Sequence, residues 1–223
     1  MCFSESASLI AFIVGVTGQL ALASKKDAQS KALALGLTSI TIIQLYEYFM
    51  WRNPCSDTVS SSLNENFSKT TMITIVAQPL YIILSLMFVA KSISFSKTPV
   101  LLISTFVYSV LAIIEVASKW NKITCSAPAG RSVRGSECDA SSCGLHWQFI
   151  DEISGFFWAA YVFLLISSIY RGVAPLKTAL IVDAFILSSY GITAALHGKQ
   201  RSLASHWCFY SVALPWIFYL LPG

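Results

Sequence analysis

Residues 143–171, CGLHWQFIDEISGFFWAAYVFLLISSIYR, join a long apolar run to three ionisable side chains near its start. An α-helix needs about 20 predominantly apolar residues to cross the hydrocarbon core of a bilayer. Residues 146–170 reach that length, although the segment opens with His146 and carries Asp151 and Glu152 within its first two turns. The stretch therefore predicts a membrane-spanning helix that carries polar chemistry at one end.

The whole chain has the composition of an integral membrane protein. Its 223 residues are 55% hydrophobic and only 12% charged, with a mean hydropathy of +0.65. Soluble domains carry about twice that share of charged residues, roughly 25%. We therefore expect an all-α, polytopic membrane protein in which residues 1–223 form one seven-helix transmembrane domain. The predicted spans are about 6–23, 32–51, 72–90, 98–118, 146–170, 178–197 and 205–221.

The distribution of basic residues predicts how the chain is oriented. Loops 24–31, 91–97 and 171–177 hold seven basic residues in 22 positions, whereas the opposite loops hold eight in 54. Because the more basic loops usually face the cytosol, the N-terminus is expected outside or in a lumen and the C-terminus in the cytosol. The plasma membrane or a secretory-pathway membrane is the expected location. The net charge of +4 includes no basic block, so no nucleic-acid partner is expected.

All six cysteines fall on the predicted outer side, where an oxidising compartment permits disulfides. They are Cys2, Cys55, Cys125, Cys138, Cys143 and Cys208. We expect up to three disulfides that tie the outer loops together, with the connectivity left open. The alternative is that the cysteines are buried thiols that act as small hydrophobic residues. Asn66 begins an Asn-Phe-Ser sequon on the same side, which predicts N-glycosylation of Asn66.

Four acids inside the predicted spans are candidate catalytic residues. They are Glu47, Glu115, Asp151 and Glu152, all within about 10 Å of the outer boundary at the helical rise. No Lys or Arg lies inside any predicted span, so protonation, a bound cation, a histidine or water must offset their charge. Ionisable residues within a membrane indicate a functional site by default, although a neutral buried acid can also simply tie helices together.

Polar and aromatic residues near these acids are the predicted ligand contacts. Gln44 shares a helix face with Glu47 because the two are three residues apart. Gln78, His146 and Trp147 are expected to line the same polar vestibule, although a tryptophan at a helix end is also typical of an interfacial anchor.

The three histidines all mark predicted outer helix ends. His146, His197 and His206 could together hold zinc or another divalent metal, because imidazole is a preferred zinc ligand. The alternative is that each is an interfacial residue or a helix cap. Asp183 departs from the pattern, because it lies near the inner end of the sixth span.

Small residues and prolines predict details of helix packing. Gly15 and Gly18 in the first span should let a neighbouring helix approach closely. Pro79 and Pro215 are expected to kink their helices, since proline removes a backbone donor and crowds the preceding turn.

Four short motifs resemble a family of small, uncharacterised seven-helix membrane proteins whose function is unassigned. They are MCFSESAS at 1–8, QLYEYFMW at 44–51, AQPLY at 77–81 and Cys-Gly-x-His-Trp at 143–147. Members of that family begin Met-Cys-Phe/Trp-Ser and carry a Glu in helix two and Gln-Pro in helix three. The resemblance implies no activity. It implies that five positions are family-like, namely Cys2, Glu47, Gln78, Pro79 and His146.

These observations predict an outward-facing polar vestibule that binds a lipid or small amphiphilic ligand. Hydrolysis of that ligand, with or without a metal, is one version, so the sequence leaves open whether the protein is an enzyme. The alternative is a proton or cation channel or transporter that uses the intramembrane carboxylates. Its path to Asp183 would have to run through Gln, Ser, Tyr and water. A structural membrane subunit is a further alternative, and a homo-oligomer is compatible with each.

Overall fold

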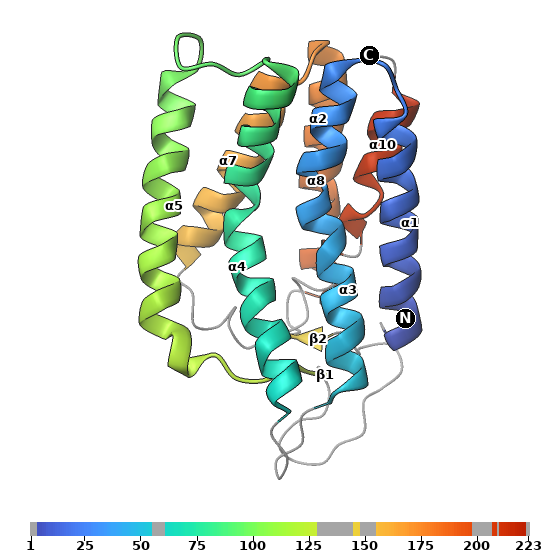
Figure 1. Cartoon of the computed structure of the whole chain (residues 1–223), viewed down its shortest axis with the longest axis vertical. Helices are drawn as coiled ribbons and strands as arrows, with labels where there is room; N and C mark the ends of the chain where they lie inside the picture. The colour runs from blue at the N-terminus through green and yellow to red at the C-terminus, as the bar shows by residue number, and fades with distance from the viewer. Residues whose placement is uncertain are drawn as a thin grey trace.

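The computed structural model describes residues 4–54, 61–128, 145–147, 155–197, 207–208 and 210–221. Within these ranges the chain is predominantly α-helical, and the long helices run side by side in alternating directions (Figure 1). The predicted all-α class is therefore confirmed. One short strand pair lies at the end of the bundle where α1 begins, and we call this end the strand end (Figure 1).

The first two predicted spans are α1 and the pair formed by α2 and α3. Helix α1, Glu5–Ala23, begins at Ser4, whose hydroxyl accepts a hydrogen bond from the N–H of Ala7 at 3.3 Å. Helices α2, Ala28–Gly36, and α3, Thr38–Arg52, follow each other with only Leu37 between them. Together they provide the length of one span.

The third span begins ten residues earlier than predicted. Helix α4, Ser62–Ser85, continues as the π-helical segment η1, Leu86–Ala90, which ends at Lys91 with a φ of 55°. The expectation that residues 62–71 form a loop is therefore wrong. Two of their polar side chains, Asn64 and Ser68, belong to a buried hydrogen-bond network, and the segment as a whole has the composition of a solvated loop.

The fifth predicted span does not begin at His146. His146 lies on strand β2, Leu145–His146, which pairs with β1, Ala127–Pro128, in antiparallel register. Helix α7 is described from Gly155 to Gly172. Leu145 and Trp147 are each only 1% exposed, so the apolar residues around His146 are buried without being helical.

The remaining elements complete the bundle. Helix α5, Pro99–Lys119, is followed by the 3-10 turn η2, Trp120–Lys122, and helix α8 covers Leu176–His197. The last predicted span is interrupted by a turn at 212–213, after which α10 covers Leu214–Leu220. Pro215 lies in the first turn of α10, where its missing N–H costs nothing. It therefore begins a helix, and the predicted kink at Pro215 is wrong.

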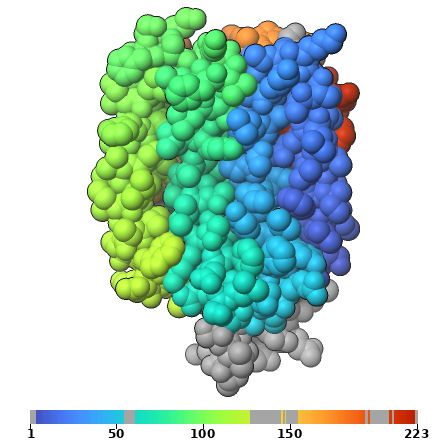
Figure 2. Space-filling view, viewed as in Figure 1, coloured from blue at the N-terminus to red at the C-terminus, as the bar shows by residue number. Residues whose placement is uncertain are grey.

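Five helical segments in the described ranges are long and apolar enough to cross a membrane. They are Glu5–Ala23, Ala28–Arg52, Ser62–Ala90, Pro99–Lys122 and Gly155–Gly172. Helix α5 forms one flank of the molecule (Figure 2) and exposes large apolar side chains such as Val100 (75%) and Phe106 (68%). Lipid chains can cover such a surface, whereas water cannot do so without cost. The molecule thus has the build of an integral membrane protein.

Glycines allow α1 to pack closely against its neighbours. A Cβ atom on Gly15 would lie 2.6 Å from Cγ2 of Thr41 on α3, and one on Gly18 would lie 2.7 Å from the ring of Trp216 on α10. These separations are too short for any larger residue, so the predicted close approach at both glycines is confirmed.

Candidate ligand-binding site

A row of polar side chains follows one face of α4. Asn64, Ser68, Thr71 and Gln78 are separated by four, three and seven residues, which places them on one side of a helix. All four are at most 1% exposed. We call them the polar stripe; its two ends are fully hydrogen-bonded and its centre is not.

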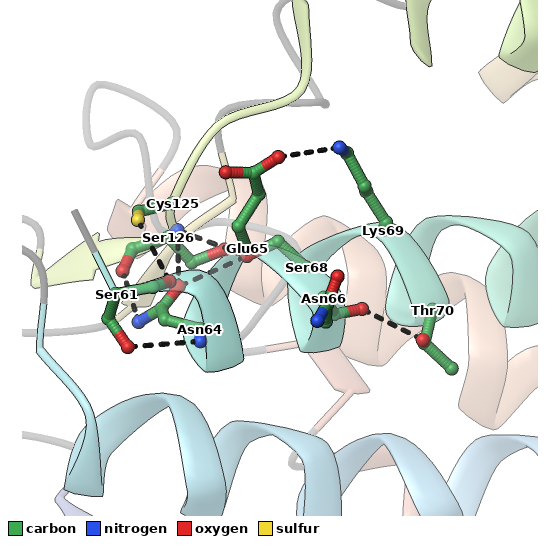
Figure 3. Close-up of polar contacts among 9 residues, drawn as sticks. All are labelled: Ser61, Asn64, Glu65, Asn66, Ser68, Lys69, Thr70, Cys125 and Ser126. Carbon is green, nitrogen blue, oxygen red and sulfur yellow. Dashed lines mark hydrogen bonds and ion pairs between the residues drawn. The ribbon is translucent and has the colours of Figure 1, made fainter. Parts of the chain in front are cut away.

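Asn64 pairs with the backbone of two segments at the strand end, the end of α3 and the residues before β1, and its contact with Ser126 is drawn in Figure 3. Its amide nitrogen donates to the carbonyl oxygens of Met50 (3.1 Å), Asn53 (3.0 Å) and Ser126 (3.0 Å). Its Oδ1 accepts from the N–H of Ser126 at 2.8 Å. The amide thus ties the end of α3, the start of α4 and the segment before β1 together.

Ser68 extends this network, because its hydroxyl lies 2.7 Å from that of Ser126 (Figure 3). Next to it, Cys125 is disulfide-bonded, and its Sγ lies 3.6 Å from the carbonyl oxygen of Ser61. Asn66 is exposed on α4 and its carbonyl accepts from Thr70. The sequon is therefore helical, and the predicted glycosylation of Asn66 stays a prediction.

Gln78 closes the other end of the polar stripe. Its Nε2 donates to the carbonyl oxygen of Ser39 at 3.0 Å, and its Oε1 accepts from the hydroxyl of Tyr161 on α7. Both halves of the amide are therefore paired, and Gln78 joins α3, α4 and α7 at one point.

The middle of the stripe lies at the same depth as a second polar side chain, on α3. Because Gln78 meets Ser39 and Asn64 meets Met50, α3 and α4 are antiparallel, and Thr71 lies about 10 Å from both ends of the stripe. The α3 residue at that depth is Gln44. Gln44 is fully buried, and neither of its side-chain polar atoms has a hydrogen-bond partner among the described residues. The Thr71 hydroxyl likewise has none within those ranges.

Glu47 lies one turn from Gln44 on the same face of α3 and is 1% exposed. Its carboxyl group interacts electrostatically with the thiol of Cys208, which in turn interacts with Tyr161. We call Gln44, Glu47 and Thr71 the central polar group. Cys208 is a free, buried thiol, so the expectation that it forms a disulfide is not met. Its burial in the hydrophobic core explains the difference.

Aromatic rings cover one side of this region. Tyr161 makes edge-to-face contacts with Trp158 at 6.1 Å and with Trp207 at 6.2 Å, and Tyr190 makes one with Trp207 at 6.1 Å. Trp207 is only 7% exposed, and its indole N–H has no hydrogen-bond partner in the described part of the chain. The rings thus extend from the Gln78 contact to the segment that carries Cys208.

Beyond Gln78 and Tyr161, the core is lined mainly by apolar side chains. The side chains there that are at most 3% exposed include Leu33, Leu37, Ile82, Ile83, Leu86, Leu165, Ile169, Val182 and Ile186, and one polar residue, Ser168. Asp183 is buried among the helices of the same half, and its Oδ1 has no partner among the residues described. The polar side chains that form hydrogen-bond networks between helices lie mainly nearer the strand end.

The structure places the predicted site residues unevenly. Gln44, Glu47 and Gln78 lie along the α3–α4 contact, whereas Glu115 is half-buried on α5, which packs against α4 and α7. Trp147 is buried, which argues against an interfacial anchor. Other predicted residues lie outside the described ranges, namely Cys2, Cys55, Cys138, Cys143, Asp151, Glu152 and His206.

The predicted metal site stays a prediction. Among the described residues, no group of three His, Cys, Asp or Glu side chains could hold a metal ion. The side chains of His146 and His197, however, are not part of that description, and neither is His206.

Sequence reasoning missed Thr71, Tyr161 and the network around Asn64. The available indication was spacing, because Asn64, Thr71 and Gln78 are separated by seven residues each. Two heptads of polar residues in an otherwise apolar helix predict a polar contact with a neighbouring helix.

Compared with known proteins, the chain matches no family model, and no curated protein or solved structure is significantly similar to it. The resemblance to small seven-helix proteins therefore stays a prediction, and the function must be argued from the site.

Proposed function

We propose that the protein is a seven-helix membrane protein that binds a small or amphiphilic ligand at the central polar group. The observation that carries the proposal is the buried amide of Gln44, whose oxygen and nitrogen have no hydrogen-bond partner among the residues that the structure describes. A buried polar group without a partner costs about 1–3 kcal/mol, and native structures rarely retain one without a reason. A ligand that pairs with Gln44 and Thr71 would remove that cost.

The membrane arrangement follows from the helices. Helix α8 has 22 residues, and the segment that ends in α10 would complete seven spans with the five already named. The strand end would face the outside or a lumen, because the more basic loops lie at the other end. The disulfide at Cys125, which lies near the strand end, supports this orientation, because disulfides persist in oxidising compartments.

Binding is favoured over conduction. A conductor must offer polar partners along its whole length, and the half of the core beyond Gln78 is lined mainly by apolar side chains. The buried acid Asp183 is the observation that keeps the proton or cation pathway as the alternative. Hydrolysis would assign Glu47 as general base, with Asp151, Glu152 and a histidine-bound metal as further participants.

Native mass spectrometry of the protein released from membranes tests the proposal. The wild-type protein should retain a bound small molecule or lipid of defined mass. Gln44→Leu and Thr71→Val, which keep the side-chain volume close, should lose it. Gln19→Leu is the matched control, because Gln19 is a buried glutamine whose Nε2 already donates to Thr41 at 2.7 Å. The same bound masses in wild type and Gln44→Leu would refute the proposal.

A further inference from the structure

We infer that the ligand has an uncharged headgroup in which a hydrogen-bond donor lies beside an acceptor, as in a carboxamide. The inference rests on the proposed function and specifies the chemistry of the same site. It follows from which polar groups at this depth of α3 and α4 have no hydrogen-bond partner in the described part of the chain, and which groups are already engaged.

The charged side chains near the site have interactions of their own. Glu47 interacts with the thiol of Cys208, so its carboxyl group is engaged. Lys69, which lies on α4 two residues before Thr71, pairs with Glu65 at 2.5 Å. A charged ligand would therefore gain a counter-ion from either side chain only by breaking an existing interaction.

The surroundings of Gln44 and Thr71 are apolar. Ile43 and Met72, which are their neighbours in the sequence, are fully buried, and Ile75, one turn after Thr71, is 3% exposed. An ionised headgroup that is buried among such side chains without a counter-ion has a much larger desolvation cost than a neutral headgroup that is hydrogen-bonded. These surroundings therefore favour an uncharged headgroup.

Gln44 and Thr71 specify the hydrogen-bonding pattern of that headgroup. Neither the oxygen nor the nitrogen of the Gln44 amide has a hydrogen-bond partner among the described residues, and a terminal amide holds its acceptor and its donors side by side. A ligand carboxamide presents the complementary acceptor and donor without a charge, so two parallel hydrogen bonds can form. An ester or an ether offers acceptors alone. The Thr71 hydroxyl, which also has no partner within the described ranges, can pair with the second N–H of the ligand or with its oxygen.

Binding of four probes that share one alkyl chain tests the inference. They are hexanamide, N,N-dimethylhexanamide, hexylammonium and hexanoate. The dimethyl compound keeps the carbonyl group but has no N–H, and the last two carry a charge at neutral pH. The full chain in phosphatidylcholine nanodiscs would be titrated by calorimetry, with empty nanodiscs as the blank. Hexanamide should bind saturably, and each of the other three should bind about tenfold or more weakly, because each leaves a buried donor or acceptor unpaired or buries a charge.

Substitutions at the site should remove this preference. Gln44→Leu should weaken hexanamide about tenfold, to the affinity of its dimethyl analogue, and Thr71→Val should weaken it severalfold. Gln19→Leu is the matched control and should keep the preference, because that buried glutamine already donates to Thr41 at 2.7 Å. Gln44→Glu keeps the shape of the side chain but replaces the amide nitrogen with an oxygen. It should weaken hexanamide and strengthen hexylammonium, which tests the inference even if Gln44→Leu misfolds.

Three results would overturn the carboxamide assignment. They are equal affinity of the wild-type protein for hexanamide and its dimethyl analogue, tighter binding of a charged probe, and no saturable hexanamide binding at millimolar concentration. The proposed ligand site would still stand if a bound mass sensitive to Gln44→Leu is found.

Discussion

The hydroxyl of Tyr161 on α7 donates a hydrogen bond to Oε1 of Gln78 on α4, and both side chains are almost completely buried. Gln78 also donates to the backbone of Ser39, so this one amide connects three helices. It separates the central polar group from the largely apolar half of the core. The pair thus marks the boundary at which the candidate site ends.

Removing the Tyr161 hydroxyl should destabilise the protein. Tyr161→Phe leaves the buried Oε1 of Gln78 without its donor, which costs about 1–3 kcal/mol. Thermal unfolding in detergent would show a lower Tm. Tyr170→Phe, on the same helix but 45% exposed, is the control and should unfold like wild type. Equal Tm values for the two variants would show that the Gln78 contact contributes nothing.

The hydrogen-bond network at the strand end should contribute more to the free energy of unfolding than an exposed residue nearby. Asn64→Ala removes a buried amide that pairs with Met50, Asn53 and Ser126, and the loss should reach about 2–4 kcal/mol because several buried backbone groups lose their partner. Asn66→Ala, two residues further on and exposed, should change the free energy of unfolding by less than about 0.5 kcal/mol. A comparable loss in both variants would contradict this account of the network.

Replacing a helical glycine with alanine should lower the stability of the protein at Gly15 and raise it at Gly191. Gly15→Ala would place a Cβ atom 2.6 Å from Thr41 and should destabilise the contact between α1 and α3 by about 1–3 kcal/mol. In Gly191→Ala, no atom of the described residues lies within 4 Å of the new Cβ, so the change should stabilise α8 by up to about 1 kcal/mol. Unfolding by denaturant would measure both, and a stable Gly15→Ala variant would rule out the close approach.

Asp27 should make stability depend on pH. Partial burial alone would raise the pKa of its carboxyl group, but hydrogen bonds from the N–H and side chain of Ser30 outweigh it and hold that pKa below its ordinary value. Stability from this cap is therefore present above the unfolded-state pKa of about 4 and is lost as pH falls through the folded-state value. Asp27→Asn should flatten that part of the stability profile between about pH 6 and pH 3. An identical acid profile for wild type and Asp27→Asn would exclude the cap as its source.

The sequence predicted most helices because a spanning helix must be apolar over its whole length. The bounds of α1 and α5 agree closely with expectation for that reason. It failed at residues 62–71 and at His146 for one physical reason. The buried network on residues 62–71 uses polar residues, which are typical of a solvated loop. The buried non-helical segment around His146 uses apolar residues, which are typical of a spanning helix.

The candidate site was predictable where a residue is unusual for its surroundings. Gln44, Glu47 and Gln78 are polar side chains inside apolar runs, which identified them without a structure. Tyr161 and Thr71 could not be found in that way, because hydroxyl-bearing residues are common in membrane helices. Their role depends on which helices pack together, and that is a property of the fold.

The Tm of Gln44→Leu compared with that of Gln19→Leu tests the central claim most directly. Because the Gln44 amide is buried without a described partner, replacing it with leucine should raise the Tm of the ligand-free protein. Gln19→Leu breaks the hydrogen bond to Thr41 and should lower it. Those opposite shifts are the result predicted for a ligand site in the central polar group. A lower Tm for Gln44→Leu would show that this amide already stabilises the resting protein, which would contradict the account.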